Sequence, residues 1–575
     1  MISFEPGDGR YVIRLGKLTV PQSTFMIAAA IVVGLGGGFG AVAFRALISG
    51  ENSLAFGVIG SFLSSHIGPA GVVLQLALGG AIAAFVASTF APEAKGHGVP
   101  EVMEAVALRG GVMRPRVIAI KALASATSIG FGGSCGREGP IVQIGSAIGS
   151  VIGQIPHAPA PIIRTLVACG AAAGISATFN APIGGVFFAA EVILGEFAPR
   201  SFAAIVVASV VSAVIGRAFL GNHPSFSAAG FALVSPWELI LYALLGMLAA
   251  LWAMGFVNVL YATEDCFERF RIPAWLKGAT GFASVGLIGV WFPQVFGVGY
   301  DAIQQVFYSH VPPAHALTLA VLKPLATSLT LGSGGSGGIF APSLFTGAFL
   351  GDGFGALAHH AFPLWTGPAA AYGLVGMAAV FAAAAEAPIT AITIVFEMSD
   401  DYTIILPLMV AVVIATLVGR KLLGSTIYER KLLRRGIDWQ RIRNPQVFAR
   451  ISVSQVGRTP PFVAQSDQSI RSIALEGAAS TELALPVCDG DRFVGVITFS
   501  DVSRAFAAGE GERPVGTITF PPQALLEPTD TLERAATLMA DPHAPLLPVI
   551  TDGDRLVGIV TRRDLLTAYR SVTAV

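Results

Sequence analysis

The sequence predicts an all-α polytopic membrane domain followed by a smaller α/β domain, and three observations support this fold class. The 575 residues are 53% hydrophobic and only 13% charged, with a mean hydropathy of +0.69. The apolar part contains an internal repeat, and the more charged C-terminal part contains a second, shorter one. Soluble globular proteins carry roughly twice this share of charged residues, so we expect a membrane protein.

Two kinds of apolar segment alternate along the chain. Those long and continuous enough to cross or enter a bilayer are residues 24–47, 71–91, 202–218, 235–260, 274–292 and 404–420. Segments around 122–197 and 324–396 are also apolar, but glycines interrupt them. Broken helices persist at membrane depth only where they line a cavity or are covered by protein. The pattern therefore indicates a transporter or a pore and not a simple anchor.

The membrane part consists of two similar halves. KALASATSIGFGGSCGREGP from Lys121 aligns without a gap with KPLATSLTLGSGGSGGIFAP from Lys323, at roughly nine identities in twenty. A second match pairs NAPIGGVFFAAEVI with EAPITAITIVFEMS and aligns Glu191 with Glu397. These matches predict a membrane domain over residues 24–443, with repeats at about 24–218 and 235–420.

The C-terminal part changes character after the basic stretch that ends near Arg443. LPVCDGDRFVGVITFSDV parallels LPVITDGDRLVGIVTRRDL, and each copy is typical of a strand, a DGDR turn, a second strand and a helix. We therefore expect a soluble α/β pair over residues 451–575, with copies at about 451–510 and 515–573.

Charge and cysteine usage narrow the classes of function. The formal net charge is zero, which gives no basic surface for nucleic acid. Four scattered cysteines lack the spacing of a disulfide framework or a zinc site. No Ser/His/Asp cluster or phosphate-binding lysine motif is present, so we expect neither an enzyme nor a required cofactor.

Basic residues lie at both ends of the membrane part, in GKLTVPQ and in GRKLLGSTIYERKLLRRG. By the positive-inside rule, both termini are expected in the cytoplasm, with residues 1–23 as an N-terminal cytoplasmic segment. That segment is polar and has no cleavable signal pattern.

Glycine-rich loops run into a proline and an apolar helix in both halves, at Pro140 and Pro342, and GHGVPEV repeats the pattern at Pro100. Glycine permits a tight turn, and proline suits a first helical turn. Helix N-termini present unpaired amides and a partial positive charge, which favours a small anion. The alternative is that the glycines only allow close helix packing.

Glu138 is an acidic residue within such a loop, and an intramembrane carboxylate is a functional hypothesis by default. Its partner in the second repeat is Phe340, so the repeat itself does not require a charge there. A salt bridge to the adjacent Arg137 is the structural alternative.

GHGVPEV, GGSCGREGP, GSGGSGGIFAP and Tyr428 in STIYERKLL resemble the signature segments of CLC chloride channels and chloride/proton exchangers, and the tail resembles a pair of CBS domains. The resemblance implies a homodimer in the cell membrane, with one pore per subunit built from two inverted repeats. Chloride would be bound by main-chain amides near Gly139, Ile339 and Phe340 and by the hydroxyl of Tyr428. Glu138 would be the gate: ionised, it occupies an anion site, and protonated, it swings away.

Two positions depart from the family pattern. Family exchangers commonly carry an inward-facing proton glutamate where this chain has Val192, and a chloride-binding serine where it has His97. Valine cannot carry a proton, so we expect a passive chloride channel gated by Glu138; the alternative is an antiporter whose proton route needs no glutamate there. Glu191 would face roughly 100 degrees away on an α-helix, so a structural role is expected. His97 either binds the anion or caps a helix.

The tail adds a nucleotide hypothesis. The resemblance implies that ATP, ADP or AMP binds at the Thr-x-x-Asp pairs Thr498 with Asp501 and Thr561 with Asp564, although both pairs also suit ordinary helix caps. A CBS-bearing magnesium transporter would need several carboxylates for its cation, whereas these loops offer amides. A fluoride-specific relative fits the loops and the tail less well.

Overall fold

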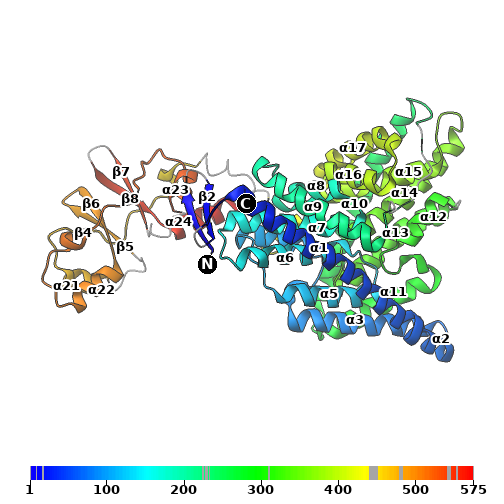
Figure 1. The fold of residues 1–575 in the computed structure, drawn as a ribbon, viewed down its shortest axis with the longest axis horizontal. Coiled ribbons are helices and arrows are strands. Elements are labelled where there is room, and N and C mark those ends of the chain that lie inside the picture. The colour runs from blue at the N-terminus through cyan, green and yellow to red at the C-terminus, as the bar shows by residue number, and fades with distance from the viewer. Residues whose placement is uncertain are drawn as a thin grey trace. The chain divides into compact units, whose positions relative to one another are not determined.

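The computed structural model describes residues 2–7, 10–15, 18–222, 226, 231, 233–308, 311–439, 451–477, 484–522, 524–539, 546–551 and 554–573. The chain divides into two compact units, Met1–Ile437 and Asp438–Val575 (Figure 1). The first is mainly helical, and the second is α/β. The predicted fold class is confirmed in both units.

The chain starts with a small antiparallel sheet that the sequence analysis did not predict. Its strands, in the order β1-β2-β3, are β1 (Ile2–Gly7), β2 (Arg10–Leu15) and β3 (Leu18–Pro21). Phe4 packs edge-on against Phe25 of the first helix, with 5.5 Å between ring centroids. The strands are so short that alternation within any one of them is a weak signal.

The first half of the membrane unit contains α1 (Gln22–Asn52), the π-helical η1 (Ser53–Gly60), α2 (Ser61–Ile67), α3 (Ala70–Phe90), the 3₁₀ turn η2 (Pro92–Ala94), α4 (Val99–Leu108), α5 (Arg116–Gly130), α6 (Glu138–Gln154), α7 (Ala160–Phe179), α8 (Pro182–Phe188), the π-helical η3 (Ala189–Leu194) and α9 (Pro199–Leu220). Helices α6 and α7 pack side by side (Figure 1).

The second half contains α10 (Glu238–Arg269), α11 (Ala274–Trp291), the 3₁₀ turn η4 (Pro293–Val295), α12 (Tyr300–Tyr308), α13 (Pro313–Gly332), α14 (Phe340–Ala361), α15 (Ala369–Ala385), α16 (Pro388–Ser399), the 3₁₀ turn η5 (Tyr402–Ile404), α17 (Ile405–Leu423) and α18 (Glu429–Arg434). Helices α14 and α15 pack together, as α6 and α7 do in the first half. The order of elements from α3 to α9 therefore recurs from α11 to α17.

Seven helices among the described residues are long and apolar enough to cross a membrane: Gln22–Ile67, Ala70–Phe90, Ala160–Phe179, Ser201–Leu220, Glu238–Arg269, Pro313–Gly332 and Tyr402–Leu423. Two of them, Ala160–Phe179 and Pro313–Gly332, lie in or next to the glycine-broken segments. The others correspond to the long apolar stretches of the sequence. The first unit is thus a multi-pass membrane protein.

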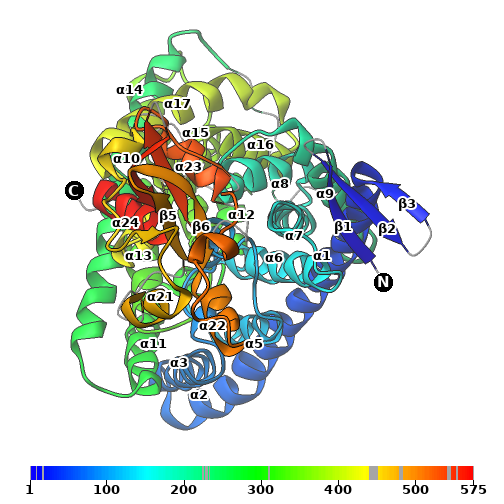
Figure 2. The same ribbon diagram turned by 90° about the vertical axis from the view of Figure 1, so that its left-hand side faces the viewer.

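Two glutamates hold the halves together by capping each other's short helices. The Glu397 carboxylate accepts hydrogen bonds from the amides of Ile183 (3.0 Å) and Gly184 (2.7 Å), at the start of α8. Reciprocally, Glu191 accepts from the amides of Ile389 (3.3 Å) and Thr390 (2.8 Å), at the start of α16. Helices α8 and α16 contact each other, as Figure 2 also shows. The structural role expected for Glu191 is confirmed.

The second unit contains η6 (Val453–Gln455), β4 (Ala464–Gln465), α21 (Ile470–Gly477), β5 (Ala484–Asp489), β6 (Arg492–Thr498), α22 (Phe499–Ala507), η7 (Val515–Ile518), α23 (Leu532–Leu538), β7 (Leu547–Thr551), β8 (Arg555–Val560) and α24 (Arg562–Thr573). Its sheet has the order β4-β5-β6-β8-β7. The hairpins β5-β6 and β7-β8 are the two predicted strand–turn–strand copies. Burial of alternate residues such as Leu485 and Val487 forms the core against α21 and α22.

Candidate functional site

Three helix-initiating loops meet inside the membrane unit, at the starts of α4, α6 and α14. Gly136 and Gly338 exchange main-chain hydrogen bonds of 2.7 and 2.6 Å, and Gly96 bonds with Gly335 and Gly337, both at 3.2 Å. The glycine-rich loops of the two repeats are therefore hydrogen-bonded directly to each other through their main chains. Because the first amides of a helix have no partner within it, several helix N-termini converge on one buried region.

Glycine is required where these loops touch. A Cβ atom on Gly139 would lie 2.1 Å from the carbonyl oxygen of His97, and one on Gly338 would lie 2.8 Å from the amide nitrogen of Gly139. Neither distance is compatible with a side chain. The predicted residues His97, Glu138, Gly139, Ile339 and Phe340 are thus brought together at this junction, which we call the loop junction.

Glu138 begins α6 and is 1% exposed. Its Oε1 accepts a hydrogen bond of 2.5 Å from the hydroxyl of Tyr300, and its Oε2 has no partner among the described residues. The amides of Glu138 itself and of Ala341, in the first turn of α14, interact electrostatically with the carboxylate. The carboxylate therefore occupies the position where a free anion would meet the same donors.

Arg137 does not form the ion pair with Glu138 that was considered from the sequence. Its guanidinium lies over the ring of Tyr300, 5.1 Å from the centroid, and its Nε is buried without a partner among the described residues. Arg137, Tyr300 and Arg45 line a cavity of about 790 Å³, here called the Arg137 cavity. Tyr300 is not among the site residues predicted from the sequence. The internal repeat could have indicated this residue. The segment GVGY, which ends at Tyr300, corresponds to GHGV, which ends at Val99, and each follows a 3₁₀ turn.

Ile339, Phe340 and Tyr428 are each 2% exposed. Phe340 packs against Phe381 and Phe179, with centroid distances of 4.2 and 5.1 Å. The phenol of Tyr428 interacts electrostatically with Glu138 and makes no hydrogen bond to another described residue. This buried hydroxyl adds one free donor to the amides of the loop junction.

His97 lies between the loop junction and a second cavity of about 300 Å³, here called the His97 cavity. Its side chain is 5% exposed, and Nδ1 has no partner among the described residues. The imidazole and the Tyr261 ring are nearly perpendicular, with 6.4 Å between centroids. An unpartnered imidazole nitrogen is unusual for a helix cap and leaves one position open to a ligand.

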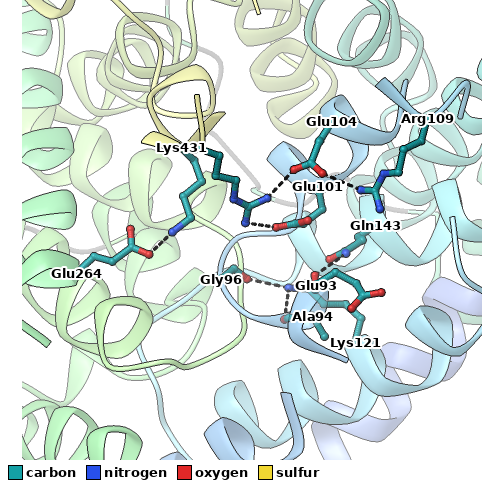
Figure 3. A network of polar contacts seen from close by, with 11 residues as sticks. Glu93, Ala94, Gly96, Glu101, Glu104, Arg109, Lys121, Gln143, Glu264 and Lys431 are labelled. Carbon is teal, nitrogen blue, oxygen red and sulfur yellow. Dashed lines mark hydrogen bonds and ion pairs between the residues drawn. The ribbon is translucent and has the colours of Figure 1, made fainter. Parts of the chain in front are cut away.

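Charged side chains surround the His97 cavity: Lys95, Glu264, Glu268, Lys431, Arg434 and Arg435. Figure 3 shows the ion pair between Lys431 and Glu264 and the acidic pair Glu101 and Glu104 on α4. Burial alone would lower the pKa of Arg435, but Glu101 and Glu104 outweigh burial and raise that pKa above its ordinary value. Three of the four cations are thus in ion pairs, because Arg434 also pairs with Asp265.

The aligned lysines hold equivalent loops in the two repeats. Nζ of Lys121 donates to the carbonyls of Ala94 (2.9 Å) and Gly96 (2.7 Å), as drawn in Figure 3. Nζ of Lys323 donates to the carbonyls of Val295 (2.9 Å) and Gly297 (2.8 Å). Each lysine thus stabilises the loop that leads into α4 or α12.

Val192 is buried at 6% exposure in η3, a segment that contacts α4. This segment is π-helical, so the α-helical angle expected between Glu191 and Val192 was wrong. Single π-helical turns inside helices are rare and often occur near functional sites.

In the second unit, both Thr-x-x-Asp pairs act as helix caps. The Thr498 hydroxyl accepts from the Asp501 amide at 3.2 Å, and the Thr561 hydroxyl accepts from the Asp564 amide at 3.3 Å. Arg458 Nε also donates to Asp564 Oδ1 at 2.7 Å. Asp501 pairs instead with Arg504 of its own helix, at 3.3 Å, so the two aspartates differ in where their arginine comes from.

Known proteins resemble this chain over most of its length. The family model described as "Voltage gated chloride channel" matches residues 79–420, and the CBS domain model matches residues 453–508 and 511–571. A protein of Ralstonia nicotianae named "Putative chloride channel protein ClcB-like" is 34% identical over 352 residues, 60% of this chain and 81% of that protein.

Exchangers are also among the relatives. The H(+)/Cl(-) exchange transporter ClcA of Citrobacter koseri is 33% identical over 419 residues, covering 71% of this chain and 88% of that protein. The solved structure of a slow cyanobacterial Cl-/H+ antiporter has a TM-score of 0.67 and 28% identity, and covers 71% of this chain and 97% of that one. With this fold, these loops and the matching family model, the chain belongs to the CLC family of voltage-gated chloride channels and related transporters, and carries two CBS domains.

Proposed function

We propose that this protein is a chloride/proton antiporter of the plasma membrane, and that it acts as a homodimer with both termini in the cytoplasm. The observation that carries this proposal is the buried Glu138 carboxylate among the helix N-termini of the loop junction. The exchange activity named for its relatives supports coupling over the passive channel expected from the sequence.

The chemistry follows from competition between two anions. The ionised Glu138 side chain and a chloride ion need the same amides, around Gly139, Ile339 and Phe340, so both cannot occupy them together. Protonation removes the negative charge and with it the attraction to these donors. Each proton taken up by Glu138 therefore makes room for a chloride ion.

His97 and Tyr428 provide the side-chain donors in this proposal. His97 offers one N–H when neutral and two when protonated, and Tyr428 offers one O–H. The cationic side chains of the His97 cavity would concentrate chloride before it reaches His97. Chloride is the substrate, and no resident cofactor is needed.

The proton route must avoid residue 192, since Val192 cannot be protonated. Water reaching Glu138 from the His97 cavity or the Arg137 cavity would supply the proton in its place. A passive chloride channel is the second candidate function, and the observation that favours it is the buried valine at this position.

For the tail we propose regulation by an adenine nucleotide, ATP, ADP or AMP, at Thr498 with Asp501 and at Thr561 with Asp564. The ion pair of Arg458 with Asp564 would have to open to admit a ribose there. Calorimetric titration of the full-length protein with each nucleotide up to millimolar concentration tests this. Heat that is lost in Asp501→Asn supports the first site, and absence of heat rejects nucleotide binding.

The antiport proposal is tested in proteoliposomes with an outward chloride gradient and an internal pH dye. We expect protons to move against their own gradient when chloride leaves. Chloride efflux without uphill proton movement would reject antiport and establish the channel.

A further inference from the structure

We propose that Tyr300 is the positioning residue for the Glu138 gate, and that its hydroxyl determines the pH at which the gate opens. The inference rests on the proposed gating function of Glu138. Its basis is the 2.5 Å hydrogen bond from the Tyr300 hydroxyl to Oε1 of Glu138. Tyr300 belongs to the second repeat and Glu138 to the first, so the gate is shared between the halves.

The direction of the hydroxyl is held by the surroundings of the ring. Phe226 contacts the Tyr300 ring edge to face at 5.5 Å, and the Arg137 guanidinium lies over it at 5.1 Å. The main chain just before Tyr300 is held in turn by Lys323, through the carbonyls of Val295 and Gly297. A side chain fixed on both sides loses little conformational entropy when it binds the carboxylate.

A hydroxyl that donates to a carboxylate stabilises its ionised form more than its protonated form. Tyr300 therefore favours the state in which Glu138 blocks the anion position, and protons must compete with this bond to open the gate. Tyr300 also borders the Arg137 cavity, so the bond lies at the end of a route open to water.

Other charged or titratable groups also act on Glu138, and they come from different elements. They are Arg137 beside it, Tyr428 at the start of α18, Lys323 of α13 and Cys135 in the preceding loop, and Arg45 of α1 acts on Tyr300. Among the described contacts, Tyr300 is the member of this set that donates a side-chain hydrogen bond to the carboxylate. Removing its hydroxyl alone leaves the other groups in place.

The test is the variant Tyr300→Phe, with chloride flux measured in proteoliposomes from pH 4 to pH 9. Losing a hydrogen bond to a charged group should move the pH of half-maximal flux upward by about one to two pH units. The sign follows because a less stabilised carboxylate is protonated at higher pH. Tyr308→Phe is the matched control, since Tyr308 lies on the same helix, is 67% exposed, and should leave the profile unchanged.

The variant Glu138→Gln distinguishes failure of the proposed gate from failure of the proposed role of Tyr300. If Glu138→Gln keeps the pH response, Glu138 is not the gate and the proposed function fails. If Glu138→Gln loses the response but Tyr300→Phe leaves the midpoint in place, the gate stands and the role of Tyr300 is overturned. Tyr300→Phe should cause no further shift in the Glu138→Gln background, and a shift there would also overturn it.

Discussion

The two halves of the membrane unit share their scaffold and differ in their chemistry. Lys121 and Lys323 hold equivalent loops, and Glu191 and Glu397 cap equivalent helices. Glu138, the proposed gate, lies in the first half, and its counterpart in the second half is Phe340. The residues that hold the main chain thus recur in both repeats, whereas the residue that we propose as the gate occurs in one of them.

The largest effect is expected from the asymmetric residue Glu138. In Glu138→Gln the side chain can no longer alternate between an anion and a neutral acid, so proton movement should disappear while chloride flux continues. Proteoliposomes loaded with a pH dye measure the proton movement, and chloride efflux is recorded from the same vesicles. Retained uphill proton movement in this variant would mean that coupling does not need the first-half carboxylate.

The symmetric lysines should behave alike. Lys121→Met and Lys323→Met each remove two hydrogen bonds from a buried ammonium group to loop carbonyls, which should cost about 2–4 kcal/mol of folding stability. Thermal melting of the detergent-purified protein measures the loss, with exposed Lys421→Met as the control. If one substitution lowers the melting temperature strongly and the other does not, the two lysines do not have equivalent structural roles in the two halves.

The capping glutamates should give smaller and again matched losses. Glu191→Gln and Glu397→Gln weaken hydrogen bonds to helix-initiating amides, which should cost about 1–2 kcal/mol each. The same melting assay applies, and exposed Glu196→Gln is the control. A changed pH profile of transport in Glu191→Gln would instead give this residue, next to Val192, a role in proton transfer.

The smallest effect is expected at His97. In the Glu138→Gln background, where the gate no longer titrates, chloride should bind equally tightly at pH 5 and at pH 7.5. Burial, together with the nearby Lys431, Lys121 and Arg435, holds the pKa of His97 well below its ordinary value, so the imidazole stays neutral and offers one N–H. His97→Ala removes this donor and should weaken chloride binding roughly three- to tenfold. Chloride titration calorimetry measures both effects, and unchanged affinity in His97→Ala would make His97 a helix cap.

The loops were predictable because their function constrains local sequence. Glycines followed by proline indicate a helix start wherever they occur, and the repeat indicated that two such loops are related. Tyr300 was not predictable in the same way. Its partner is 162 positions away, and only the approach of two loops from different repeats makes it a neighbour of Glu138.

Two other features depended on geometry that sequence patterns do not encode. The π-helical turn at Val192 has the same apolar composition as an α-helical one. The N-terminal sheet is held by pairing between strands of four to six residues, so no single segment carries the signal. By contrast, the tail hairpins were predicted because the DGDR turn marks each of them.

The reciprocal caps also set an order for biosynthesis. The amides of Ile183 and Gly184 receive their carboxylate from Glu397, more than two hundred residues later in the chain. During insertion these amides have no hydrogen-bond partner until the second half is made, and an unpaired amide in the bilayer costs several kcal/mol of free energy. The nascent first repeat is therefore expected to depend on membrane chaperones, or on the translocon itself, until the ribosome has completed the second.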